Sequence, residues 1–198
     1  MEKLTKKKQK LLLSLIKNKN FKEIETLILS LEKEEKEKPF LLNLLGVSKL
    51  NKKNLNKEEA TNEAVEAQNL FKKAYTKDNL FFDALYNFAQ TSIKTLNHED
   101  AIDLLEGNLK RVNYDFRTVF LLAKINFQLG NIEKSINHYE NIVERNEATP
   151  AVWKNLIFIF NYSTLFNQKK YIDLCKKYTN TIKKVDKKNF VNFKYKEK

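Results

Sequence analysis

Apolar residues recur at helical spacing on both sides of a turn signal in the segment VFLLAKINFQLGNIEKSINHYENIV, from Val119 to Val143. Apolar positions three and four residues apart predict amphipathic helices, and the sequence Leu129-Gly130-Asn131 between them predicts a turn. The segment belongs to a longer pattern, because residues 116–149 align with residues 82–115 over 34 positions. Both copies have an apolar residue at the seventh place, alanine at the eighth and a small residue at the twentieth. The pattern predicts two successive pairs of antiparallel helices.

This 34-residue period resembles the tetratricopeptide repeat (TPR). Small residues at the eighth and twentieth places let the two helices of a pair approach closely, while larger residues fill the flanks. One pair cannot bury its apolar face without neighbours, so stacked pairs share one continuous core. The resemblance predicts an all-α protein, an α-solenoid of antiparallel helix pairs that forms a TPR superhelix of about four and a half repeats.

The same register extends in both directions along the chain. Pro39 begins a copy with Leu45-Gly46 at the seventh and eighth places, and its second helix carries Ala67 and Phe71. The connection inside this copy is about nine residues longer than the period allows, which we interpret as a solvated insertion or an extension of one helix. We expect a solenoid over 1–166 with repeats at about 5–38, 39–81, 82–115 and 116–149, followed by the first helix of a fifth repeat from 150. After the solenoid we expect a C-terminal capping helix over 167–185 and a basic tail or linker over 186–198.

The composition agrees with a helical domain in a reducing compartment. Three glycines and two prolines among 198 residues, 42% of them hydrophobic, favour helices with short connections around a sizeable core. Cys175 has no second cysteine to pair with, which suits a reducing compartment. The apolar runs LLLSLI and LIFIF are too short for a signal core or a membrane span. We expect a cytoplasmic protein with no membrane contact.

The net charge of +12 is concentrated at the two ends of the chain. Residues 1–22 hold eight lysines against one glutamate, and residues 167–198 hold eleven lysines against three acidic residues. We interpret the basic ends as solvated helix faces and a tail, because a phosphate-binding surface usually favours arginine, which occurs at three positions. Nucleic acid is therefore not the expected partner.

No residue pattern indicates catalysis. Cys175 lies on the apolar edge of a predicted helix without a neighbouring histidine or acid, and we interpret it as a buried structural cysteine. His98 and His138 are too few for a zinc site, and the isolated glycines form no phosphate-binding loop. The aromatic residues near the end, Phe160, Tyr162, Phe166 and Tyr171, are expected to pack between the last helices. The sequence predicts no catalytic residue, no metal and no cofactor.

The TPR resemblance implies an inner concave groove, lined by the second, fifth, sixth, ninth and thirteenth places of the first helices. Amide side chains there can pair with the backbone of an extended peptide, and aromatic residues can accept its side chains. The same places hold Lys154, Phe158 and Tyr162. The alternative is that these residues merely face water. The candidate peptide-binding residues are Asn43, Asp83, Tyr86, Asn87, Gln90, Lys94, Arg117, Lys124, Gln128 and Asn155.

A narrower resemblance rests on NLIFIFNYSTLFNQKKYIDLCKKY, residues 155–178. It resembles the segment after the last repeat in bacterial glycosyltransferases similar to the O-linked N-acetylglucosamine transferases (SPINDLY-type), through Asn161-Tyr162 and the helix expected from Asn167. In those glycosyltransferases a histidine commonly occupies the position of Cys175. The resemblance implies a substrate-recruiting array, without catalysis of its own, that precedes a glycosyltransferase domain and holds its acceptor peptide by asparagines such as Asn87 and Asn155. The alternatives are a free-standing TPR adaptor and a basic nucleic-acid-binding protein.

Overall fold

The computed structural model describes residues 5–181, in which helices are joined by turns and short loops without any β-strand. The predicted all-α class is confirmed. The helices of this part of the chain are α1 (Lys6–Lys17), α2 (Phe21–Leu29), α3 (Lys33–Lys36), α4 (Pro39–Leu50), α5 (Lys57–Lys77), α6 (Phe82–Thr95), α7 (Glu99–Val112), α8 (Phe116–Gln128), α9 (Ile132–Glu144), α10 (Pro150–Phe160) and α11 (Gln168–Thr181).

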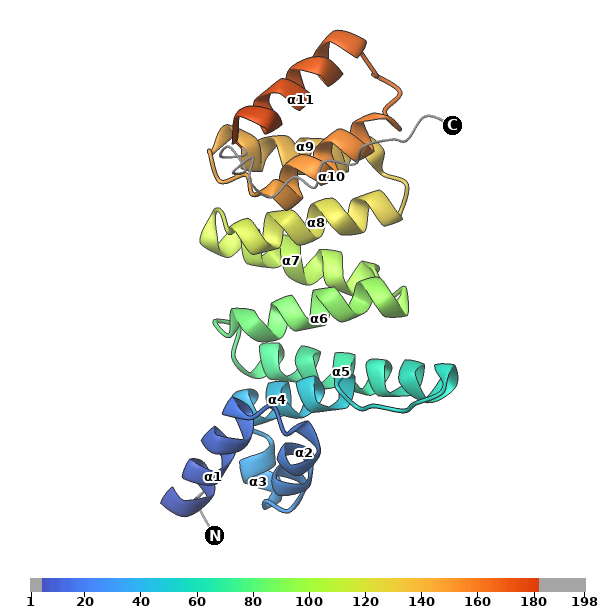
Figure 1. Cartoon of the computed structure of the whole chain (residues 1–198). Helices are drawn as coiled ribbons and strands as arrows, with labels where there is room; N and C mark the ends of the chain where they lie inside the picture. Colours follow the sequence, from blue (N-terminus) through green and yellow to red (C-terminus); the bar gives the residue numbers. More distant parts are fainter. Residues whose placement is uncertain (1–4, 182–198) are drawn as a thin grey trace, which may run out of the picture.

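The helices stack as successive antiparallel pairs, from the blue N-terminal end to the orange end in Figure 1. The pairs are α1–α2, α4–α5, α6–α7, α8–α9 and α10–α11, and the one-turn helix α3 lies before α4. The second helix of one pair contacts the first helix of the next, as α5 contacts α6, α7 contacts α8 and α9 contacts α10. The first helices α4, α6 and α8 also contact one another in order. The predicted α-solenoid is confirmed.

Several of these helices have an N-cap residue at their first turn, where the chain leaves a connection and becomes helical. Asn56 and Glu59 form a capping box, in which each side chain accepts a hydrogen bond of 2.9 Å from the other residue's backbone N–H. The carboxylate of Asp115 accepts a bond of 2.8 Å from the backbone N–H of Thr118. Pro150 occupies the first turn of α10, where its missing N–H costs nothing. The extra residues of the second pair form the connection 51–56 and lengthen α5, which spans 21 residues.

Close approach of paired helices depends on the small residues at the eighth and twentieth places. A Cβ atom at Gly46 would lie 2.6 Å from Cε1 of Phe71, so α4 and α5 can pack at this distance because Gly46 has no side chain. The hydroxyl of Ser135 donates a 2.7 Å hydrogen bond to the carbonyl of Ala123 across α8 and α9. The predicted turn after α8 contains Gly130 at φ +77°, a conformation that favours glycine.

Three apolar clusters form a core that runs along the stack. The first, around Ile24 and Ile28, comes from α1, α2 and α4, and the second, around Phe71 and Phe88, extends from α4 to α8. The third, around Leu156, joins α8 to α11. Each cluster contains residues from at least two helix pairs, so the pairs stabilise one another.

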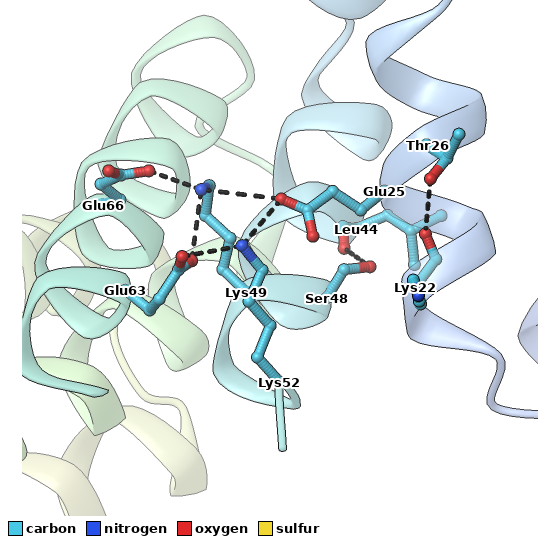
Figure 2. Close-up of polar contacts among 9 residues, drawn as sticks. All are labelled: Lys22, Glu25, Thr26, Leu44, Ser48, Lys49, Lys52, Glu63 and Glu66. Atoms are coloured by element: carbon cyan, nitrogen blue, oxygen red, sulfur yellow. Dashed lines mark hydrogen bonds and ion pairs between the residues drawn. The ribbon is translucent and has the colours of Figure 1, made fainter. Parts of the chain in front are cut away.

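Charged side chains also connect the first two pairs (Figure 2). Lys52 places its Nζ 3.1 Å from Glu25 on α2 and 2.7 Å from Glu63 on α5. Lys49 on α4 contacts both of these carboxylates and Glu66. Burial opposes the charge of Glu63, but the hydrogen bonds and charges of the two lysines outweigh it and lower the pKa of Glu63.

One expectation about the end of the array needs correction. Cys175 is half-buried rather than buried, because α11 is the last helix of the described residues and packs on α10 along one side. Leu174, beside it, is the residue of α11 that is buried. The part of the expected capping helix after Thr181 and the expected tail over 186–198 lie outside the described residues.

Candidate functional site

The ten predicted peptide-binding residues all lie on the first helices of successive pairs, and none is buried. We call the exposed and half-exposed surface of these helices the first-helix face. It carries Asn43 on α4; Asp83, Tyr86, Asn87, Gln90 and Lys94 on α6; Arg117, Lys124 and Gln128 on α8; and Asn155 on α10. Leu44 and Leu121, which occupy sixth places, are buried in the core and do not contribute to it.

Two of the predicted asparagines form a direct link between repeats. Nδ2 of Asn87 on α6 donates a 2.9 Å hydrogen bond to Oδ1 of Asn43 on α4. Within residues 5–181, Nδ2 of Asn43 and Oδ1 of Asn87 make no hydrogen bond, so the pair still offers one donor group and one acceptor group to a ligand.

A second link joins α6 to α8 over one repeat. Nη1 of Arg117 lies 3.0 Å from Oδ1 of Asp83, and the guanidinium stands 5.8 Å from the centre of the Tyr86 ring. Nε2 of Gln90 donates a 3.1 Å hydrogen bond to the Tyr86 hydroxyl. These contacts hold four of the predicted residues in one cluster, and the charges of Arg117 and Asp83 compensate each other.

The lysines of the face are not compensated in this way. Nζ of Lys124 lies 5.9 Å from the centre of the Phe120 ring, a favourable cation–π distance. Among the described residues, neither Lys94 nor Lys124 nor Lys154 forms an ion pair. Their ammonium groups therefore remain available to an anionic ligand.

Asn155 has a different environment from Asn87. Its Nδ2 donates a 3.0 Å hydrogen bond to the hydroxyl of Tyr139 on α9, a side chain that is 1% exposed. Burial raises the pKa of Tyr139 to about 12, while the bond from Asn155 acts in the opposite direction. Asn155 thus satisfies a core hydroxyl, and the structure does not bring it together with Asn43 and Asn87.

Aromatic side chains extend the face beyond the polar residues. Phe127 on α8 packs edge-on against Phe158 and Tyr162, with ring centres 5.9 and 6.0 Å apart, and the last two are 5.3 Å apart. Phe158 is 53% exposed and Tyr162 is 57% exposed. Tyr162 therefore does not pack between the last helices as expected, whereas Phe160 does. Phe127 is not among the residues predicted from the sequence, although its spacing of three residues from Lys124 places it on the same side of α8.

Other candidate chemistry is not supported by the part of the chain that the structure describes. Over residues 5–181, His, Cys, Asp and Glu side chains nowhere gather in a group of three or more that could hold a metal ion. Burial lowers the pKa of His138. None of the described helices has the length and apolar character needed to cross a bilayer.

Comparison with known proteins identifies the fold. No known family and no curated protein matches the sequence. Solved structures do match: MamA from Desulfovibrio magneticus RS-1 (41-end) has a TM-score of 0.70 with 17% identity, over 87% of this chain and 91% of that chain. MamA AMB-1 has a TM-score of 0.65 with 12% identity, over 87% of this chain and 88% of that one.

The chain is a TPR-like helical solenoid. MamA MSR-1 also matches 87% of this chain over 92% of its own length, with a TM-score of 0.64 and 12% identity. In each comparison the shared solenoid therefore covers most of this chain and most of the matched chain. At sequence identities this low, the structural matches establish the shared fold alone.

Proposed function

We propose that the protein is an interaction module that binds an extended peptide or a segment of a partner protein on its first-helix face. The observation that carries the proposal is the continuity of this face. Side-chain contacts cross from α4 to α6 (Asn43 with Asn87), from α6 to α8 (Asp83 with Arg117) and from α8 to α10 (Phe127 with Phe158).

The chemistry of the face suits an extended chain. An extended peptide presents one backbone donor and one acceptor at nearly every residue, and the Asn43–Asn87 pair keeps one of each. Aromatic and arginine side chains are enriched at the energetically important positions of protein interfaces. A scaffold whose repeats pack through many contacts also holds such side chains in place before the partner arrives, which lowers the entropic cost of binding.

The test is an unbiased selection of displayed peptides against the full chain, followed by charge-reversal variants. Lys94→Glu alters the first-helix face, and Lys134→Glu on α9 is the matched control, since both lysines are exposed and unpaired within residues 5–181. We expect selected peptides to lose affinity with Lys94→Glu and to keep it with Lys134→Glu. Failure to select any peptide, or equal sensitivity to both variants, would contradict the proposal.

A narrower version of this proposal assigns the module to a glycosyltransferase of the O-linked N-acetylglucosamine type as its substrate-recruiting part. Its support is the Asn161-Tyr162 pair followed by α11, which begins at Gln168 with Asn167 accepting a 3.0 Å hydrogen bond from the backbone N–H of Lys170. The names of the matched solved structures add nothing to it. Reading the DNA beyond the codon for Lys198 tests it: a downstream strand and glycine-rich loop would support it, and their absence would favour a free-standing adaptor.

A cytoplasmic location is part of the proposal. One cysteine in 198 residues is compatible with a reducing compartment. Fractionation of cells that express the full chain, with a cytoplasmic enzyme as the marker, tests this part independently of peptide binding.

A further inference from the structure

The C-terminal half of the first-helix face contains a contiguous, solvent-facing aromatic surface. We call it the aromatic platform: Phe127, Phe158 and Tyr162, which are in mutual edge-on contact. Scattered apolar residues are common on protein surfaces, but a contiguous cluster usually marks an interaction site. Phe158 and Tyr162 are each more than half exposed, although burial of such rings would be strongly favourable.

Each helix that contributes to the platform also places a lysine beside it. Lys124 precedes Phe127 by three residues on α8, and Lys154 precedes Phe158 by four residues on α10. Helical residues at these spacings are neighbours, with Cβ atoms roughly 5–6 Å apart. Both lysines are without an ion pair among the described residues. Each of the two platform helices thus carries a lysine whose Cβ atom lies about one helical turn from a platform ring, while Nζ of Lys124 itself lies near the Phe120 ring.

The charge differs between the first helices α6, α8 and α10 and the second helices α7 and α9. Helices α6, α8 and α10 carry four basic residues and Asp83, and Asp83 is already paired with Arg117. Helices α7 and α9 carry seven acidic residues against three basic ones. A ligand with negative charge is therefore attracted to α6, α8 and α10 and repelled by α7 and α9, whereas α11 carries four lysines against Asp173 and does not repel it.

We propose that the platform with Lys124 and Lys154 binds an acidic segment of a partner protein that carries an aromatic side chain close to a glutamate or aspartate. This inference rests on the proposed function and names the class of peptide. In an extended strand, residues i and i+2 face the same side, roughly 6.6 Å apart. That separation is similar to one helical turn, so a Glu-X-Phe sequence places its carboxylate near a lysine when its ring lies on the platform.

The experiment measures the fluorescence anisotropy of a labelled peptide with two Glu-Gly-Phe units, titrated with the full chain at physiological salt. Replacing the peptide's phenylalanines by alanine is expected to weaken binding about tenfold, because the aromatic contact supplies a large share of the interface. The variant Lys124→Glu with Lys154→Glu is expected to weaken binding at least about tenfold. Its matched control, Lys110→Glu with Lys134→Glu on the second helices, should leave the affinity unchanged.

A charge exchange separates recognition from damage to the fold. A second peptide with Lys-Gly-Phe units is expected to bind the Lys124→Glu, Lys154→Glu variant more tightly than it binds the wild-type chain. A misfolded variant would bind neither peptide, and its circular dichroism melting curve would show the defect. Phe158→Ala should lower the affinity for both peptides by the same factor, because the aromatic platform does not distinguish their charges.

Three results would overturn the inference. The first is equal affinity of the wild-type chain for the Glu-Gly-Phe and Lys-Gly-Phe peptides. The second is no loss with Phe158→Ala, and the third is that an oligothymidylate, rather than the peptide, binds at this face at physiological salt. If peptides from the unbiased selection bind the first-helix face but lack acidic and aromatic residues, the inference fails while the proposed function stands. If no peptide binds that face, both fail.

Discussion

Nδ2 of Asn155 on α10 donates a 3.0 Å hydrogen bond to the hydroxyl of Tyr139 on α9, inside the C-terminal core. Asn155 occupies the sixth place of its repeat. The sixth place of the preceding repeat holds the buried Leu121, and that of the repeat before it holds Asn87, whose amide donates a hydrogen bond to Asn43 at the surface. One repeat position therefore supplies a core link at one level of the stack and a surface amide at another.

Asn155→Ala is expected to lower the free energy of unfolding by about 1–2 kcal/mol, because it leaves a buried hydroxyl without its partner. Asn87→Ala removes a hydrogen bond between half-exposed side chains and should cost no more than about 0.5 kcal/mol. Urea denaturation of both variants measures the difference. The control is Asn155→Ala in a Tyr139→Phe background, where the cost should shrink because the hydroxyl is gone. Equal costs for Asn155→Ala and Asn87→Ala would contradict the structural role.

Gly46→Ala and Gly107→Ala should have opposite effects on stability. An added Cβ at Gly46 would lie 2.6 Å from the ring of Phe71, which is 0% exposed in the close-packed core, so we expect a loss of about 1–3 kcal/mol. An added Cβ at Gly107 on α7 meets no atom within 4 Å. Alanine there should stabilise the helix by roughly 0.5–1 kcal/mol. Thermal unfolding of the two variants tests this, and an unchanged or raised melting temperature for Gly46→Ala would show that close helix approach at Gly46 does not matter.

Glu63→Gln should weaken the connection between the first two helix pairs in a pH-dependent way. The lysine contacts lower the pKa of Glu63 below its ordinary 4.5, so the carboxylate contributes stability above that value and loses it as the pH falls through the lowered pKa. At neutral pH we expect a loss of about 1 kcal/mol, since the pair is partly exposed. The loss should shrink in strong salt and in acid.

Urea denaturation of Glu63→Gln at neutral and acidic pH measures this contribution. Glu58→Gln on the same helix is the control, because Glu58 is exposed and makes no ion pair within residues 5–181. A pH-independent difference between Glu63→Gln and the wild-type chain would mean that the ion pairs are not its cause.

Local sequence patterns predicted the repeat scaffold because the same places recur in the same chemical roles. Alanine at 89 and 123 and glycine at 46 mark the close contacts, and the larger residues Phe71, Phe88 and Leu122 are buried where the period requires. For the long second repeat, the sequence predicted either a solvated insertion or an extension of one helix. Local charge and helix propensity did not decide between the two, and α5 is indeed lengthened.

The candidate face was predicted as a set of positions, and its individual contacts were not. A period specifies which residues lie on a given side of a helix, but it does not specify whether the residue opposite is a tyrosine hydroxyl, as for Asn155, or another amide, as for Asn87. The aromatic platform has the same origin. Phe127 and Phe158 are 31 positions apart and meet because α8 and α10 lie at successive levels of the stack.

The sequence by itself determined the helical class, the pairing of the helices and the places of close packing, because these depend on short-range spacing that repeats along the chain. The tertiary structure decided which polar groups face the core and which face a ligand, and it brought the charges of α2, α4 and α5 and the rings of α8 and α10 together. Those relationships depend on the rotation and separation of helices from different repeats, which side-chain packing across the interfaces sets.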